Sequence, residues 1–277
     1  MHIDELQNRP GTDEVSSRTE GGILERIFNP ASIIGYRNEY LRLSTTLSYS
    51  YLLTLPFLLL YELGVMLMNL GAPSGVRISA DVLVKRFMNL VGLDGTFAFG
   101  LVILLLGAGI LWYERRHGVV IRARYLGFMF LESLAYALLL GTLVGTIVAG
   151  LFGMSIDSAA LQMPGQPGGS ILSGLVLSLG AGVYEELIFR LVLVSLLFAI
   201  LFFLRTSQVV RYGIAAIIGA LIFSAIHYTG PFGDEFTLAS FTFRFLMGLA
   251  LNGLMLLRGF GIAVAAHALY DVYVTLL

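Results

Sequence analysis

The sequence contains no cysteine and few charged side chains. Charged residues make up 13% of its 277 residues and hydrophobic residues 57%, whereas about 25% of a soluble globular chain is charged. The absence of cysteine excludes disulfides, zinc–thiolate sites and a cysteine nucleophile. A formal net charge of −1 gives no basic face for nucleic acid. Together with the mean hydropathy of +0.85, these values indicate a polytopic membrane protein rather than a soluble enzyme or a disordered chain.

The beginning of the chain is polar. Residues 1–30 contain paired acids, prolines and glycines without sustained apolar periodicity, and no apolar segment there resembles a cleavable signal peptide. We therefore expect residues 1–50 to form a polar tail and a membrane-surface helix, and residues 51–277 to form the transmembrane domain. Lys85 is the single lysine among the basic residues. This excess of arginine is typical of a GC-rich bacterial genome, so the predicted location is the bacterial inner membrane.

Seven apolar runs are long enough to cross a membrane, for which about 20 residues are needed. They lie at about 51–70, 96–113, 126–153, 171–204, 213–229, 239–257 and 259–277. The run 171–204 is either one long helix or two short spans broken near Arg190. A single crossing places the basic loops on one side and the base-free loops 154–169 and 230–238 on the other, as the positive-inside rule requires. The sequence therefore predicts an all-α bundle of seven spans, with eight as the alternative.

Two further patterns predict local features. Apolar residues at helical spacing around Lys85 and Arg86 predict a helix over Ala80–Leu93 on the membrane surface. Small residues recur at every fourth position in two of the runs, which allows helices to approach closely in lipid. These residues are Gly141, Gly145 and Ala149 in one run and Gly174, Ser178 and Gly182 in another.

Ionisable side chains inside the predicted spans are the strongest functional signal. A charge at the bilayer centre costs about 2.5–3.5 kcal/mol on insertion scales, so such residues pair, face water or take part in chemistry. They are Glu62, Glu132, Glu185, Glu186, Arg190, His227, Arg244, His267 and Asp271. We expect Glu62 and Glu132 to lie near the interface or to bond a neighbouring helix, and Arg244 to extend its guanidinium to the membrane surface.

Three of the predicted helices carry functional groups four residues apart, on one face. The pairs are Glu186 and Arg190, Phe223 and His227, and His267 and Asp271. Glu185 is rotated by about 100° from Glu186 and points elsewhere. A buried carboxylate can take a proton from water, one imidazole can orient that water, and a second can donate to a developing oxyanion. These are the parts needed to hydrolyse an amide without a serine or cysteine nucleophile.

These residues form three motifs, Glu185-Glu186-x-x-x-Arg190, Phe223-x-x-x-His227 and His267-x-x-x-Asp271. In this order on separate apolar helices, they resemble the CAAX prenyl protease type II and bacteriocin-processing family of intramembrane glutamic endopeptidases. The resemblance implies a catalytic core at about 170–277, with Glu185 and His227 activating water and with His267 and Asp271 stabilising the oxyanion. Glu186, Arg190 and Phe223 would support the site.

Asp271 departs from the pattern of the well-studied prenyl proteases, which have asparagine at the matching position. An ionised carboxylate repels an oxyanion, so Asp271 must be protonated or must orient His267. Alternatively, Glu185, His227, His267 and Asp271 make a nitrogen and oxygen ligand set for a divalent metal such as zinc. The favoured mechanism uses no cofactor, and a metal-dependent protease on the same residues is the alternative.

The predicted function is an intramembrane endopeptidase that cleaves a membrane-associated protein or peptide. The predicted partners are that substrate and the lipid bilayer, without nucleic acid. One alternative is a non-enzymatic membrane scaffold or bacteriocin-immunity protein that keeps an inherited bundle. Another is a proton-coupled transporter, because intramembrane carboxylates and histidines also build proton relays. The sequence shows no internal inverted repeat of the kind that transporters favour.

Overall fold

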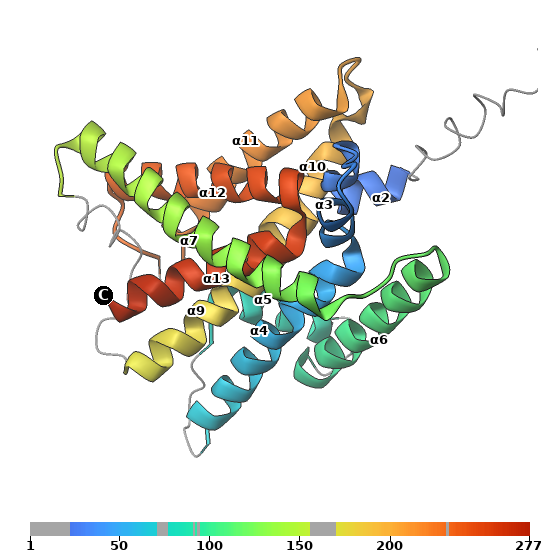
Figure 1. The fold of residues 1–277 in the computed structure, drawn as a ribbon. Helices are drawn as coiled ribbons and strands as arrows, with labels where there is room; N and C mark the ends of the chain where they lie inside the picture. Colours follow the sequence, from blue (N-terminus) through green and yellow to red (C-terminus); the bar gives the residue numbers. More distant parts are fainter. Residues whose placement is uncertain (1–22, 71–76, 91, 93–94, 156–169, 231–232) are drawn as a thin grey trace, which may run out of the picture.

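The computed structural model describes residues 23–70, 77–90, 92, 95–155, 170–230 and 233–277, which form helices joined by short segments (Figure 1). The short elements are α2 (Ile23–Phe28), η1 (Pro30–Ile33), α3 (Glu39–Ser44) and α5 (Ser79–Leu90). The long ones are α4 (Leu47–Met68), α6 (Gly95–Arg116), α7 (Ala123–Phe152), α9 (Ile171–Glu185) with its continuation, α11 (Gln208–Ile226), α12 (Leu238–Arg258) and α13 (Phe260–Leu276). The predicted all-α fold is confirmed.

Six helices in the described ranges are long and apolar enough to cross a membrane. They correspond to the first six predicted spans, and the seventh corresponds to α13, which has only 17 residues. The chain is thus an integral membrane protein, while the side on which each loop lies stays a prediction. Residues 23–28, which we expected in the polar tail, form α2. The rest of that tail at 1–22 and most of the loop 154–169 lie outside the described residues.

The run that begins at Ile171 is one continuous helix to Phe203 rather than two spans. After α9 it becomes a π-helix, η2 (Glu186–Val194), and then continues as α10 (Ser195–Ile200) and a 3₁₀ turn, η3 (Leu201–Phe203). Its 33 residues would extend about 50 Å at 1.5 Å per residue. The π-helix, with i→i+5 hydrogen bonds, is a rare conformation that is found frequently at functional sites.

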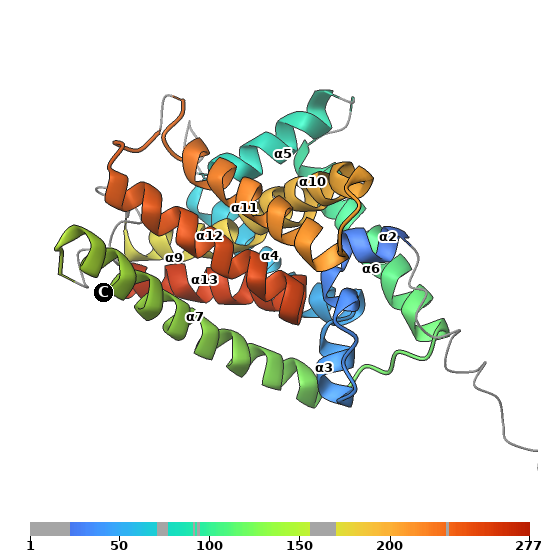
Figure 2. The same ribbon diagram turned by 90° about the horizontal axis from the view of Figure 1, so that it is seen from above.

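Helix α13 lies at the centre of the bundle. It packs against α9, α7, α4 and α12 (Figures 1 and 2), and every residue from Gly261 to Ala268 is buried. A helix that is apolar on all sides is expected in such a position. Gly259, with a φ of 85°, makes the tight turn between α12 and α13.

The spaced small residues include positions where α13 closely approaches its neighbours. A Cβ on Gly182 would lie 2.6 Å from the backbone nitrogen of Ala268, so the two helices are in near-backbone contact. Gly141 lies against the ring of Tyr270 in the same way. The prediction of close helix packing is confirmed at Gly182 and Gly141.

An ion pair holds α5 to α4, and a hydrogen bond holds α9 to the same glutamate of α4. Lys85 Nζ lies 2.7 Å from both Glu62 Oε1 and Asp81 Oδ1, and the hydroxyl of Tyr61 donates to Asp81 at 2.8 Å. Tyr184, the residue before Glu185, donates a hydrogen bond to Glu62. Glu62 is therefore a partner between helices, which was one of its two expected roles. The position of α5 on the membrane surface stays a prediction.

A second ion pair, with a tyrosine hydrogen bond, joins α3, α7 and α12. The Arg258 guanidinium lies 2.5 Å and 2.7 Å from the two carboxylate oxygens of Glu132, and Tyr40 donates to the same carboxylate at 2.6 Å. Burial and this neighbouring carboxylate raise the pKa of the Tyr40 hydroxyl, so it remains a donor at neutral pH. Glu132 thus bonds a neighbouring helix, as one of its expected roles required.

Candidate active site

The junction of α9 and η2 directs two adjacent glutamates to different surroundings. Glu185 is the last residue of α9 and its side chain is 19% exposed, whereas Glu186 begins η2 and its side chain is fully buried. This follows from the rotation of about 100° between neighbouring helical residues. Glu185 faces His227, and Glu186 faces His267 and Arg190.

Glu185 and His227 form an open pair. Oε2 of Glu185 lies 3.9 Å from Nε2 of His227, too far for a direct hydrogen bond. On the other side of the ring, Nδ1 of His227 lies 2.7 Å from the carbonyl oxygen of Phe223. Because a carbonyl only accepts, Nδ1 carries the proton and Nε2 of the neutral ring presents its lone pair to Glu185. Two acceptors at this separation can share one water that donates to each.

His267 makes its close contact with Glu186, on a different helix. Nδ1 of His267 lies 2.7 Å from Oε1 of Glu186, and Nε2 lies 3.5 Å from Oδ2 of Asp271. A carboxylate on Nδ1 fixes the proton there and stabilises the imidazolium form, in which Nε2 is also a donor. The sequence predicted Asp271 as the neighbour of His267, either as a protonated donor or as the group that orients the ring. It did not predict the Glu186 contact, which joins residues 81 positions apart.

Arg190 supports this arrangement from a buried position. Its side chain is 1% exposed and lies 3.0 Å from Oε1 of Glu186, which is the ion pair that the spacing predicts. The guanidinium carbon lies 4.2 Å from the centre of the Phe223 ring, within the range of a cation–π contact. The same ring meets the His227 ring edge-on, with 4.8 Å between centroids. Phe223 therefore connects the Arg190 side chain to the His227 side chain.

The four side chains considered as metal ligands lie in two pairs, Glu185 with His227 and His267 with Asp271. Within the described ranges, no three His, Asp or Glu side chains converge in a way that could hold a metal ion. The metal-dependent alternative therefore stays a prediction, and no step of the proposed reaction depends on a metal.

Arg244 does not extend to the membrane surface, so the expectation for this residue was wrong. Its side chain is 1% exposed, and Nη2 lies 2.7 Å from Oδ2 of Asp234, in the segment that follows α11. Sequence reasoning did not connect Arg244 with His227, although both residues border the same base-free loop.

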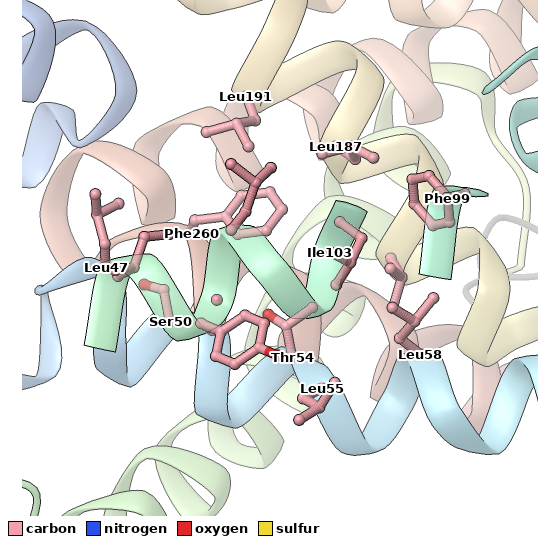
Figure 3. A pocket seen from close by; sticks show the side chains of 15 residues that line it. Leu47, Ser50, Thr54, Leu55, Leu58, Phe99, Ile103, Leu187, Leu191 and Phe260 are labelled. Atoms are coloured by element: carbon pink, nitrogen blue, oxygen red, sulfur yellow. The ribbon is translucent and has the colours of Figure 1, made fainter. Parts of the chain in front are cut away.

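An apolar cavity of about 180 Å³ lies between α4 and α6 (Figure 3). Val183, Leu187 and Leu191, from the helix that carries both glutamates, line one wall. Phe99 and Ile103 of α6 contribute another part of the lining. The cavity includes none of the candidate catalytic side chains, so it lies beside the site rather than within it.

Comparison with known protein families supports the relationship suggested by the three motifs. Residues 167–273 match a family model described as type II CAAX prenyl endopeptidase Rce1-like. No curated protein and no solved structure matched the chain. The matched residues include all three motifs and the helices that position them. Residues 167–273 are therefore similar to the type II CAAX prenyl endopeptidase Rce1-like family, as the motifs predict.

Proposed function

We propose that this protein is an intramembrane endopeptidase in which Glu185 and His227 activate a water molecule. The observation that carries the proposal is the open pair: 3.9 Å between carboxylate and imidazole, with Nδ1 of the ring committed to the Phe223 carbonyl. This leaves one acceptor on each group directed at the same small volume. Such an arrangement suits a shared water better than it suits a structural hydrogen bond, which would close to about 3 Å.

In the proposed reaction, the water donates to Glu185 and to Nε2 of His227 and attacks the carbonyl carbon of the scissile peptide bond. A carbon–oxygen bond forms while the water proton passes to Glu185, which acts as the general base. The carbonyl oxygen becomes an oxyanion. The proton is then returned to the amide nitrogen, directly or through His227, and the carbon–nitrogen bond breaks. Acid and amine products account for all atoms of water and peptide.

The second histidine would stabilise the oxyanion. With Nδ1 of His267 bonded to the Glu186 carboxylate at 2.7 Å, the imidazolium form is favoured and Nε2 donates toward the substrate. Asp271, 3.5 Å from that nitrogen, assists as a protonated second donor or by orienting the ring. Arg190 pairs with Glu186 at 3.0 Å and supplies the opposite charge. Removing any of these side chains would disturb the charge balance on which the oxyanion site depends.

The substrate would be a membrane-associated protein or peptide. The candidate residues lie in or directly beside apolar helices, where a lipid-modified chain end is concentrated by the bilayer. The matched family model describes prenyl endopeptidases, so a farnesylated C-terminal peptide is the first substrate to test. A metal-dependent protease on the same residues and a non-enzymatic scaffold or immunity protein are the alternatives that the test must separate.

The test uses the purified full chain in liposomes with two fluorogenic peptides, one bearing a farnesylated cysteine near its C-terminus and one without the lipid. We expect cleavage of the farnesylated peptide, mapped by mass spectrometry, and its loss in His227→Gln. Chelator should leave the rate unchanged. Parent-like cleavage by His227→Gln would refute the mechanism, inhibition by chelator would favour the metal alternative, and no cleavage of either peptide would favour a scaffold.

A further inference from the structure

The segment that follows His227 is tied to α12 by a buried arginine. Arg244 Nη1 donates to the hydroxyls of Tyr228 and Ser240, each at 2.6 Å, and Nη2 lies 2.7 Å from Oδ2 of Asp234. Its side chain is 1% exposed. A buried guanidinium in an apolar helix is costly unless it is paired and hydrogen-bonded. The partners found here all lie within the first turn of α12 or in the segment that joins it to α11.

The same segment is hydrogen-bonded to the backbone of His227. The amide of Asp234 donates to the His227 carbonyl oxygen at 2.9 Å. His227 directly follows the last residue of α11, where carbonyl groups lack partners from their own helix. Asp234 therefore has two attachments: its side chain binds Arg244, and its main chain fixes the carbonyl of His227. Tyr228, the next residue after His227, is held by the same guanidinium.

We propose that Arg244 and Asp234 are positioning residues for His227. Their ion pair holds the end of α11 so that Nε2 of His227 faces Glu185. The inference rests on the proposed function, because it assigns a task to residues that do not touch the reacting atoms. Two hydrogen bonds then hold the histidine: Nδ1 to the Phe223 carbonyl at 2.7 Å and the Asp234 amide to the His227 carbonyl at 2.9 Å. If the hydrogen bond from Asp234 is lost, the hydrogen bond between Nδ1 and the Phe223 carbonyl can break and re-form.

The chain offers a matched control in the same helix. Arg258 is also buried in α12, with its side chain 5% exposed, and it pairs with Glu132 at 2.5 Å. Its partners lie in α7 and α3 rather than beside His227. Arg258→Gln and Arg244→Gln therefore remove equivalent charges from equivalent environments. A role limited to stability predicts the same outcome for both, whereas a positioning role predicts a difference at His227 alone.

The first measurement needs no substrate. The chain has only four histidines, so ¹⁵N-histidine NMR of the full protein in detergent micelles can follow the ring of His227 after assignment with His227→Gln. We expect a single Nδ1–H tautomer in the parent and in Arg244→Lys, which keeps the charge. In Arg244→Gln we expect a mixture of tautomers or an exchange-broadened signal, with Arg258→Gln like the parent.

The second measurement is cleavage of the farnesylated peptide, with rates normalised to folded protein. Arg244→Gln should lower kcat by about 10–100-fold with little change in KM, the scale expected for a misplaced catalytic group. Arg244→Lys should recover part of that loss, and Arg258→Gln should keep the parent kcat. A parent-like His227 signal in folded Arg244→Gln, or an equal change in Arg258→Gln, would overturn the proposal. Failure of the parent to cleave peptide would instead count against the proposed function.

Discussion

Glu185 and Glu186 are neighbours in the sequence but lie in different environments, so the same substitution at each should affect stability differently. Glutamine is nearly isosteric with glutamate and removes the charge without opening a cavity. We expect Glu185→Gln to abolish turnover while the protein stays folded. We expect Glu186→Gln to destabilise the fold first, and to lose activity as a result.

The magnitudes follow from the contacts of each carboxylate. Glu185 is 19% exposed, and its nearest ionic partner in the described residues is 3.9 Å away, so its loss leaves no group without a partner. A surface-like contact of this kind contributes about 0–1 kcal/mol to stability. Loss of a general base lowers the rate by about 10²–10⁴-fold. Over that range the barrier rises by about 2.7–5.5 kcal/mol.

Glu186 is fully buried between Arg190 at 3.0 Å and His267 at 2.7 Å. Removing one partner of a buried ion pair costs about 3–5 kcal/mol, because the other charge remains without compensation. For a chain of this size, that loss corresponds to a decrease of roughly 6–20 °C in melting temperature. The amide of Glu186→Gln would also bring its own N–H groups against the N–H donors of Arg190 and His267.

The assay compares both variants with the parent in one detergent, first by thermal melting and then by peptide cleavage at a temperature where each remains folded. The reasoning is refuted if Glu185→Gln cleaves at the parent rate. It is equally refuted if Glu186→Gln melts at the same temperature as the parent, because the buried contacts of Glu186 with Arg190 and His267 would then contribute no stability.

Two further predictions concern α13. Asp271→Asn should keep activity and move the alkaline limit of the pH–rate profile upward, because an amide cannot lose a proton as the protonated carboxyl would. Loss of activity in this variant, together with loss of bound zinc by elemental analysis, would favour the metal alternative. Gly182→Ala should destabilise the protein by about 1–3 kcal/mol, because the new Cβ would lie 2.6 Å from the nitrogen of Ala268. Gly109→Ala, where nothing lies within 4 Å, should melt at or above the parent temperature.

Local patterns in the sequence were sufficient to predict the helices and some of their contacts. Apolar runs of about 20 residues predicted the spans, and spacing of four residues predicted the Glu186–Arg190 pair that the structure contains at 3.0 Å. These features depend on neighbours along one helix. The close approach at Gly182 was predicted for the same reason, because small residues at every fourth position form one flat face.

Contacts between distant helices were not predictable in this way. The partner of His267 is Glu186 rather than only Asp271, and this depends on how α13 packs against η2. The wrong prediction for Arg244 has the same cause. A general rule for arginine near helix ends placed its guanidinium at the membrane surface, whereas Asp234 provides a partner within the protein. The π-helix was also missed, since its apolar sequence has no local signal that distinguishes it from an α-helix.

The central position of α13 has a consequence for biosynthesis. This helix carries His267 and Asp271 and is in contact with α4, α7, α9 and α12, all of which precede it in the chain. A ribosome therefore releases the surrounding helices into the membrane before the helix that fills their centre. Until then a nascent chain has the carboxylate and the first histidine without the second. Under the proposed mechanism, hydrolytic competence would therefore be acquired only after α13 has been synthesised.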